Sequence, residues 1–226
     1  MLQYYLIWLI KNDKILKMKE AELYFEENII LENEFVLLRP LKESDFEFLL
    51  PFSINEPNIW KYSLVSADGE ENLKNYLNIA ITAKNNKTEY PFIVYDKIKK
   101  AYAGSTRFYD INFLFKSAQL GYTWYGKDFQ GTYVNKNCKY LLLEFVFEKL
   151  LFERLEFRAD NLNERSIAAM KAIGCKVDGI LRSNMPTRDS SIRRDSIVLS
   201  ILKEEWFNQI KKQLLNQLMK FDLNIL

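Results

Sequence analysis

The sequence LGYTWYGKDFQGTYVNKNCKYLLL, residues 120–143, decides the fold. It begins with aromatic and β-branched residues that predict a strand, and it runs into a segment, 134–151, that is apolar nearly all round and predicts a helix buried against a sheet. A glycine-containing loop joins the two. The first amides of a helix lack partners within it and point into such a loop, where the helix dipole adds partial positive charge. We therefore expect an anion site, and a pyrophosphate suits it.

Nearby residues favour an anion at the same place. Gly131 would let a ligand approach the backbone closely, because it has no side chain. Lys127, Lys136 and Lys139 can supply diffuse positive charge around the loop. The expected site depends on main-chain amides, which every residue type provides.

The flanking segments predict a sheet between helices. Strands at 91–95, 102–110 and 118–125 are separated by polar turns, which is typical of an antiparallel meander. The other expected elements are a strand at 34–39, helices at 41–50 and 68–83, a strand at 155–159, a helix at 163–173, a strand pair at 175–181 and 191–202, and a closing helix at 204–221. No linker or repeat interrupts the chain, so we expect residues 29–226 to form one α/β domain that ends in a helix.

Residues 1–28 are expected to be an N-terminal extension. Its apolar run, 2–10, is too short to cross a bilayer, and neither preceding positive charges nor a small-residue cleavage site marks it as a secretory signal. Three interpretations remain: a helix packed on the domain, a weak interfacial anchor, or translated upstream sequence before a natural start at Met18. We favour the last, which places residues 1–17 outside the natural protein.

Composition excludes several classes of function. The 32 Lys and Arg nearly balance the 30 Asp and Glu, so we expect no nucleic-acid partner. The chain contains no histidine, which excludes Ser-His and Cys-His nucleophiles and histidine-ligated metal sites, and we expect no metal. Cys138 and Cys175 form no CxxC pair, so neither a zinc ribbon nor a disulfide framework is expected. A cytoplasmic location without stable membrane association fits.

Several motifs together resemble the Gcn5-related N-acetyltransferase (GNAT) family, in particular its RimJ/RimL-like branch. They are VLLRPL at 36–41 with a following SD, G-Y-x-W at 121–124, QGT at 130–132 with KYLLLEF at 139–145, LEFRADNLNERSIAAMKAIGC at 155–175, DGILR at 178–182 and RDSIVLSILKEEW at 194–206. Each motif is weak, but their order and spacing are specific. The resemblance implies a GNAT fold of the α+β type: a mixed, mostly antiparallel sheet of six to seven strands, splayed near the fourth strand, flanked by helices, with acetyl-CoA in the splay.

The resemblance also implies which residues bind acetyl-CoA. They are Trp124, Tyr125, Gln130, Gly131, Thr132, Tyr133, Val134, Asn135 and Asn163. The backbone amide near Trp124 or Tyr125 would stabilise the oxyanion. Where the family pattern is Q/R-x-x-G-x-G/A, this chain has Tyr133 for the glycine and Asn135 for the small residue. We interpret the change as a branch variant, in which the Asn135 amide or the Thr132 hydroxyl donates a replacement hydrogen bond.

Catalytic residues follow less directly. The N-x-x-S element implies that Asn163 holds the pantetheine arm and that Ser166 lies near the sulfur as acid or hydrogen-bond donor; the alternative is a helix cap and an ordinary first-turn residue. The family's positions for a glutamate base hold Gln119 and Met185, which cannot take a proton. By alternation Glu156, Arg158 and Asp160 share one strand face, so Glu156 and Asp160 are candidates for the base, or each is a solvated or salt-bridged carboxylate. Glu89 is a further candidate, and a water-mediated or baseless route is equally open.

Acceptor recognition is expected in NEPNIWKYS, residues 55–63. Glu56, Trp60 and Tyr62 would place a carboxylate beside aromatic faces, which suits a cationic amine, or they form a packed aromatic hinge. The loop at 182–195 holds four arginines, which either reach an acidic acceptor or form a solvated hairpin tip.

The expected function is transfer of acetyl from acetyl-CoA to a primary amine, either a protein N-terminal α-amine or a small-molecule amine, by direct attack in a ternary complex. A site without a strong base favours an α-amine over lysine, whose amine is harder to deprotonate. One alternative is a catalytically impaired CoA-binding or protein-interaction domain. Another is a membrane-associated acyltransferase anchored by residues 1–10. Whether the chain forms a homodimer is left open.

Overall fold

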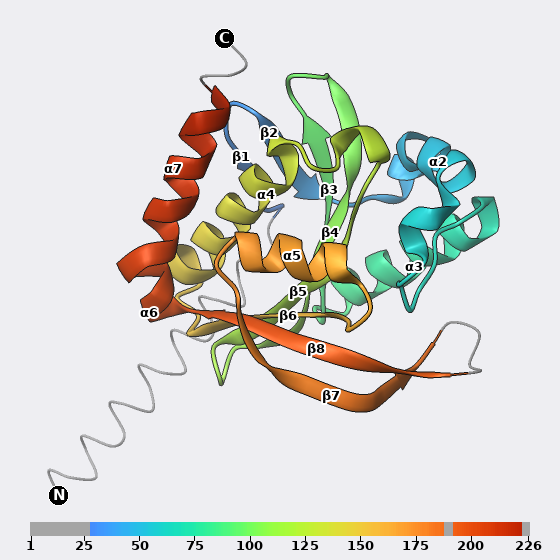
Figure 1. Cartoon of the computed structure of the whole chain (residues 1–226). Coiled ribbons are helices and arrows are strands. Elements are labelled where there is room, and N and C mark those ends of the chain that lie inside the picture. The colour runs from blue at the N-terminus through green and yellow to red at the C-terminus, as the bar shows by residue number, and fades with distance from the viewer. Residues whose placement is uncertain (1–27, 188–191, 223–226) are drawn as a thin grey trace, which may run out of the picture.

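A computed structural model describes residues 28–187 and 192–222 (Figure 1). The expectations about residues 1–17 and the anchor at 1–10 lie outside the described residues. The described helices include none that is long and apolar enough to cross a bilayer.

The core of the fold is a sheet with the strand order β1-β2-β3-β4-β5-β6-β8-β7. The strands are β1 (Leu31–Glu32), β2 (Val36–Pro40), β3 (Tyr90–Asp96), β4 (Ala101–Asn112), β5 (Ser117–Tyr125), β6 (Arg154–Asp160), β7 (Lys176–Pro186) and β8 (Arg193–Leu202). Every neighbouring pair is antiparallel except β5 and β6, which are parallel. The predicted fold class is therefore confirmed. The two-residue β1, which pairs with β2, is an addition that the sequence pattern did not show.

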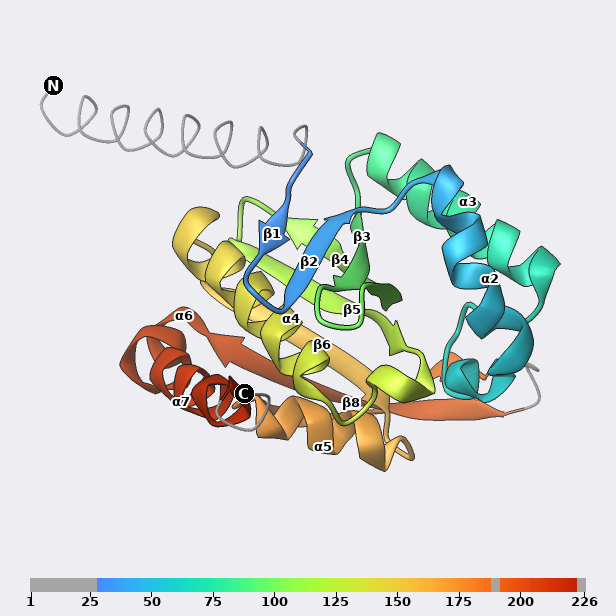
Figure 2. The same cartoon turned by 90° about the horizontal axis from the view of Figure 1, so that it is seen from above.

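Helices cover both faces of the sheet, with α2 and α3 on one face and α4, α5 and α7 on the other (Figure 2). The helical elements are η1 (Glu43–Asp45), α2 (Phe46–Asn55), η2 (Pro57–Trp60), α3 (Glu70–Asn85), η3 (Lys127–Phe129), α4 (Tyr133–Glu144), η4 (Phe145–Lys149), α5 (Glu164–Ala172), α6 (Lys203–Glu205), η5 (Trp206–Ile210) and α7 (Lys211–Asp222). The predicted helix at 134–151 is α4 followed by the π-helical turn η4, and both are largely buried as expected.

Each face of the sheet has its own hydrophobic core. In β3, Phe92 and Val94 belong to the core under α4 and α7, whereas Ile93 between them belongs to the core under α2 and α3. Successive side chains of a strand point to opposite faces, so a strand buried on both sides needs apolar residues at every position. The run PFIVY meets that need.

The sheet opens between β5 and β6. Their parallel pairing covers only Ser117–Gln119 and Arg154–Glu156, although β5 continues to Tyr125 and β6 to Asp160. A β-bulge bends β5 in this region, where Tyr122 has a φ of 48°. The two strands therefore diverge beyond Gln119, which is the splay that the family resemblance implies near this strand.

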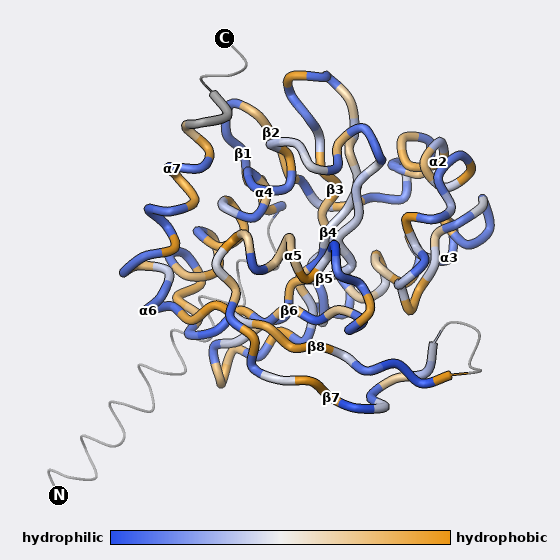
Figure 3. The backbone as a smooth tube through the Cα atoms, in the orientation of Figure 1, coloured by the Kyte–Doolittle hydropathy of each residue, from blue (hydrophilic) through white to orange (hydrophobic). Residues whose placement is uncertain are grey.

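The hairpin of β7 and β8 is longer than predicted. Its strands were expected to end near residue 181 and to resume at 191, but β7 extends to Pro186 and β8 begins at Arg193. Arg182, Arg193 and Arg194 thus lie on strands rather than in a loop, and Arg188 falls outside the described residues. In Figure 3, β8 changes from hydrophobic near α6 to hydrophilic toward the hairpin end.

Candidate functional site

A cavity of about 540 Å³ occupies the opening between β5 and β6. Its walls come from both strands, from the start of α4, from α5, and from the segment 59–65 that follows α2. The closed part of the sheet ends at the pair Gln119 and Glu156, and Gln119 already lines the cavity. The cavity therefore results from strand divergence. Beyond Gln119 and Glu156, the edges of β5 and β6 that face each other no longer pair with one another.

The loop before α4 forms one end of the cavity. Gln130, Gly131, Thr132 and Asn135 all line it. Gly131 has a φ of 73°, which favours glycine, and a side chain built there would meet open space. Thr132 caps the helix: its Oγ1 accepts a hydrogen bond from Val134 N (3.3 Å) and donates one to Phe129 O (2.8 Å). The helix thus begins at the cavity, with first-turn amides that have no carbonyl partner within the helix.

Tyr133 and Val134, the other two loop residues of the expected set, do not line the cavity. The Tyr133 hydroxyl donates to both carboxylate oxygens of buried Asp96 (2.8 Å each), and burial together with this carboxylate raises the pKa of Tyr133. Val134 is fully buried in the core. The tyrosine that replaces the family's glycine therefore points into the protein and takes no space from the cavity, to which these residues can offer only backbone.

Several wall residues have buried polar atoms without a partner. Among them, Trp60 Nε1, Gln119 Oε1 and Trp124 Nε1 have no hydrogen-bond partner within the described residues. A buried polar atom without a partner costs free energy, so a ligand that supplies one is favoured. An elongated ligand with amide groups along its length and an anionic end at α4 matches this wall.

The beginning of α5 forms the opposite side. Asn163 and Ser166 both line the cavity, as expected from the N-x-x-S element. Asn163 Oδ1 accepts a hydrogen bond from Ser166 N (3.1 Å), so Asn163 also caps the helix. Arg165 Nη1 donates to Gln130 Oε1 (2.5 Å), and Gln130 Nε2 donates to Tyr125 O (2.6 Å). Side-chain bonds therefore join β5, the loop and α5 around the cavity.

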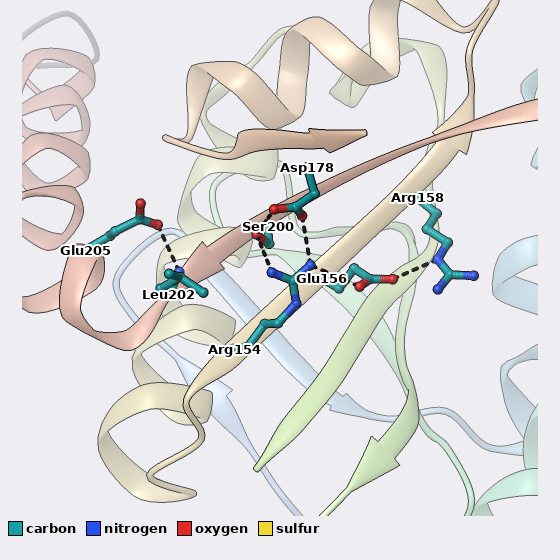
Figure 4. Close-up of polar contacts among 7 residues, drawn as sticks. All are labelled: Arg154, Glu156, Arg158, Asp178, Ser200, Leu202 and Glu205. Atoms are coloured by element: carbon teal, nitrogen blue, oxygen red, sulfur yellow. Dashed lines mark hydrogen bonds and ion pairs between the residues drawn. The ribbon is translucent and has the colours of Figure 1, made fainter. Parts of the chain in front are cut away.

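The predicted carboxylates separate into two groups. Figure 4 shows Glu156 between Arg154 Nη2 (3.1 Å) and Arg158 Nε (2.7 Å), and Glu156 does not line the cavity. Glu89 likewise lies outside it, in an ion pair with Arg107 Nη1 (2.6 Å). Asp160 lines the cavity, and its Oδ1 accepts from Leu162 N (2.9 Å). Of these three, Asp160 is placed to meet a ligand.

The segment after α2 contributes aromatic rings. Trp60 and Tyr62 line the cavity, and the Trp60 ring packs 5.1 Å from that of Trp124. Glu56 does not line it; its Oε2 accepts from Lys127 N (2.7 Å) and fixes the start of the loop before α4. Trp60 is 1% exposed, so it forms part of the core as well as part of the wall.

The sequence did not indicate Tyr109 and Asp110 of β4, which line the cavity although they come from a distant segment. Met185 of β7, a family position for a glutamate base, and Arg194 of β8, one of the four arginines of 182–195, line it as well. Arg194 Nη1 donates to Tyr62 O (3.3 Å), which ties the hairpin to the segment after α2. No local motif marks Tyr109 or Asp110, since only the folded sheet brings them to the site.

Lys139 is the most unusual wall residue. It was expected to add diffuse charge near the loop, but it lies in the second turn of α4, is 5% exposed and lines the cavity. Its Nζ donates to Thr123 Oγ1 of β5 (3.1 Å), and burial lowers the pKa of Lys139 to about 8. Its spacing could have indicated this position, because Lys139 follows Asn135 by four residues and Lys136 by three, and all three face the cavity.

The arrangement resembles known structures closely. A family model described as an acetyltransferase (GNAT) domain matches residues 36–176. Comparison with curated protein sequences finds no match.

Solved structures match over most of their length. One, from T. thermophilus and assigned as an acetyltransferase, is 30% identical, with a TM-score of 0.74 over 83% of this chain and 96% of that one. A GCN5-related N-acetyltransferase from Brucella melitensis is 22% identical, with a TM-score of 0.78 over 85% and 86%. Mycobacterium smegmatis RimJ, solved in complex with CoA-disulfide, is 15% identical, with a TM-score of 0.70 over 84% and 93%.

Proposed function

Since this chain belongs to the GNAT acetyltransferase family, we propose that it transfers the acetyl group of acetyl-CoA directly to a primary amine, in a ternary complex of enzyme and both substrates. The acceptor is a protein N-terminal α-amine or a small-molecule amine. Acetyl-CoA supplies an activated thioester, and the protein supplies binding, orientation and electrostatics.

The observation that carries this proposal is the cavity between the diverging strands, with the start of α4 at one end. Amides of the turn from Gly131 to Asn135 would hold the pyrophosphate, because they combine N–H groups that have no carbonyl partner within the helix with the helix dipole. The strand opening would hold the pantetheine arm, with Asn163 and the unpartnered Gln119 Oε1 beside it. The residues present thus fit the polarity of the pyrophosphate and of the pantetheine arm of CoA.

The acid and base roles follow from what lines the cavity. A backbone amide near Trp124 or Tyr125 would face the oxyanion, and the Ser166 hydroxyl would donate toward the sulfur. Asp160 would take the proton of the acceptor amine, since it is the expected carboxylate that reaches the cavity. Glu156 already holds two arginines, which leaves it as an ion-pair residue in this proposal.

An α-amine suits this site better than a lysine side chain. The α-amino group has a pKa of about 7.7–8.0 against about 10.4 for lysine, so freeing a lysine amine at neutral pH costs about 3 kcal/mol more. Both family positions for a glutamate base hold residues that cannot take a proton, Gln119 and Met185, and both line the cavity. A weakly assisted site therefore favours the α-amine, because a much larger fraction of it than of a lysine amine is neutral at this pH.

Two measurements test the function. Acetyl-CoA titrated into the protein should release heat with a defined stoichiometry, and thiol release should then be followed with peptide pairs that differ only in which amine is blocked. We expect turnover with the free α-amine and little with the free lysine. Turnover with the free lysine and little with the free α-amine would contradict the proposed α-amine acceptor, but not the proposed acetyltransferase activity.

A second candidate function is CoA binding without catalysis. Gln119 favours it, because a glutamine in the cavity wall cannot act as a base. The replacement of the family's glycine by Tyr133 gives this candidate little support, because the tyrosine side chain binds Asp96 and leaves the cavity open. A thermal shift with acetyl-CoA but no thiol release across a broad panel of amines would favour this candidate over the first.

A further inference from the structure

Lys139 has an environment that a structural lysine would avoid. Its side chain is buried between Thr123 of β5 and Phe157 of β6, with Nζ 3.1 Å from Thr123 Oγ1 and 5.6 Å from the centre of the Phe157 ring. No carboxylate of the described residues forms an ion pair with it. An ammonium carries three N–H donors, and burying one without a counter-charge is costly. The fold therefore tolerates a charge that it does not neutralise.

The position of this charge is specific. Phe157 is the first β6 residue beyond the last pair that joins β5 to β6, and Thr123 lies in the bulged part of β5. Lys139, Thr123 and Phe157 all line the cavity, and they come from three different elements that meet where the sheet opens. The lysine thus approaches the strand opening from the α4 side, about 9 Å further along the helix than its first residue, Tyr133, at 1.5 Å per residue.

We propose that Lys139 is a cofactor-binding residue, which donates hydrogen bonds from its ammonium to an oxygen at the thioester end of acetyl-CoA. This inference rests on the proposed function. The Thr123 hydroxyl fixes the direction of Nζ, since Thr123 Oγ1 is itself held by Thr106 Oγ1 at 2.7 Å. The remaining N–H groups of Lys139 can then donate hydrogen bonds to an acyl or amide oxygen in the opening.

The alternative is a purely structural lysine, and proton exchange separates the two. A ligand oxygen that accepts from the ammonium favours the charged form and raises the pKa of Lys139. A ligand that only excludes water from it disfavours the charged form and lowers that pKa further. Cofactor binding near pH 8 therefore takes up protons in the first case and releases them in the second.

Neighbouring titratable groups do not obscure this signal. The groups that act on Lys139 electrostatically are Cys138 of its own helix and Cys175 after α5. Burial raises the pKa of each thiol to about 12, so both stay protonated at pH 8. The Tyr125 hydroxyl of β5, which contacts Cys138, has a pKa raised well above its ordinary value by burial.

The test is calorimetric titration of acetyl-CoA into the full chain at pH 8, repeated in two buffers of different ionisation enthalpy. On binding, the wild type should take up as much as about half a proton per site, because the Lys139 amine is about half protonated at a pH near its pKa. Lys139→Met should lose that uptake and bind acetyl-CoA at least tenfold more weakly. Lys149→Met removes an equal charge from an exposed position of η4 and should match the wild type.

The outcomes separate this inference from the proposed function. If the wild type binds no acetyl-CoA, the proposed function itself is wrong. If the wild type binds but releases protons, or if Lys139→Met binds with unchanged affinity and proton count, the lysine is structural and only the inference is overturned. The Lys139→Met variant should fold, with an unchanged or higher Tm, because it removes a buried charge.

Discussion

The two halves of the cavity are built in different ways. The half at α4, which we call the cofactor half after the proposed function, comes from one continuous segment, β5 to the second turn of α4; Thr132 sets its backbone conformation and Lys139 adds a buried amine. The half opposite, which we call the acceptor half, comes from four separate segments and includes Trp60, Tyr109, Asp160 and Arg194. A cofactor common to a whole family can be held by backbone, whereas an acceptor that differs between members needs side chains that can change.

The most damaging change to this arrangement should be Gly104→Ala. A Cβ at Gly104 would lie 2.0 Å from Trp124 O and 2.9 Å from the Cα of Tyr125, and a neighbouring backbone cannot move aside cheaply. We expect a loss of at least about 3 kcal/mol in the free energy of unfolding, together with loss of acetyl-CoA binding.

Urea denaturation measures the loss, and Gly179→Ala is the matched control. Gly179 lies on the edge strand β7, where an added Cβ meets nothing within 4 Å, so its effect should stay within about 0.5 kcal/mol. Equal stability of the two variants would show that the bulge of β5 does not depend on close approach at Gly104.

The buried lysine makes stability depend on pH. Burial lowers the pKa of Lys139 from 10.5 to about 8, so the unfolded chain binds the proton more strongly between these values. Above about pH 10.5 the lysine is neutral in both states and its burial as an ammonium costs no stability. As the pH falls from 10.5 through 8, the folded protein loses stability relative to the unfolded chain. Relative to Lys139→Met, the wild type should gain up to about 3 kcal/mol between pH 7 and pH 10.5.

Denaturation of both proteins at several pH values measures this difference. Cys138 and Cys175 also change protonation on unfolding in this range, but they do so in both proteins and cancel in the comparison. A difference that is flat with pH would mean that Lys139 stays charged in the folded protein, with a partner that the geometry does not show.

The acceptor half is tested by Asp160→Asn. Asparagine keeps the oxygen that accepts from Leu162 N and removes only the ability to take a proton. If Asp160 is the base, kcat/KM should fall about 100-fold while the Kd of acetyl-CoA stays the same. Glu156→Gln on the same strand is the control and should keep activity within about twofold of the wild type, since Glu156 lies outside the cavity. Equal losses in both variants would remove Asp160 from the mechanism.

The sequence predicted the cofactor half better than the acceptor half, for physical reasons. The succession of strands and helices along the chain, the splay and the GNAT family were all predicted and are confirmed. The succession of elements follows from alternation and from a long apolar helix, whereas the splay and the family follow from a resemblance whose motifs extend from residue 36 to residue 206. Met185 was indicated only as a family position for a glutamate base, and Arg194 only as one of four arginines in an expected loop, because no pattern local to the hairpin specifies that β7 extends to Pro186.

Within the two halves, the sequence could not show which residues of each element line the cavity and which belong to the core. The Q-G-T loop predicted six wall residues, but a helix turns about 100° per residue, so Gly131, Thr132 and Asn135 face the cavity while Tyr133 and Val134 face the core. Alternation placed Glu156 and Asp160 on one strand face. It could not show that β5 still pairs with β6 at Glu156 and has separated from it at Asp160.

Tyr133 gives the smallest expected effect and the sharpest test of the boundary between core and cofactor half. Its position in the motif was expected to bind the cofactor, but its hydroxyl donates to Asp96 at 2.8 Å. Tyr133→Phe should cost about 1–2 kcal/mol of stability, because buried Asp96 loses one of its donors and keeps the amides of Ile98 and Lys99. Acetyl-CoA affinity, measured by calorimetry below the Tm of the variant, should not change. A weaker affinity at unchanged stability would place the tyrosine on the cofactor, and the main chain would then not be sufficient to hold it.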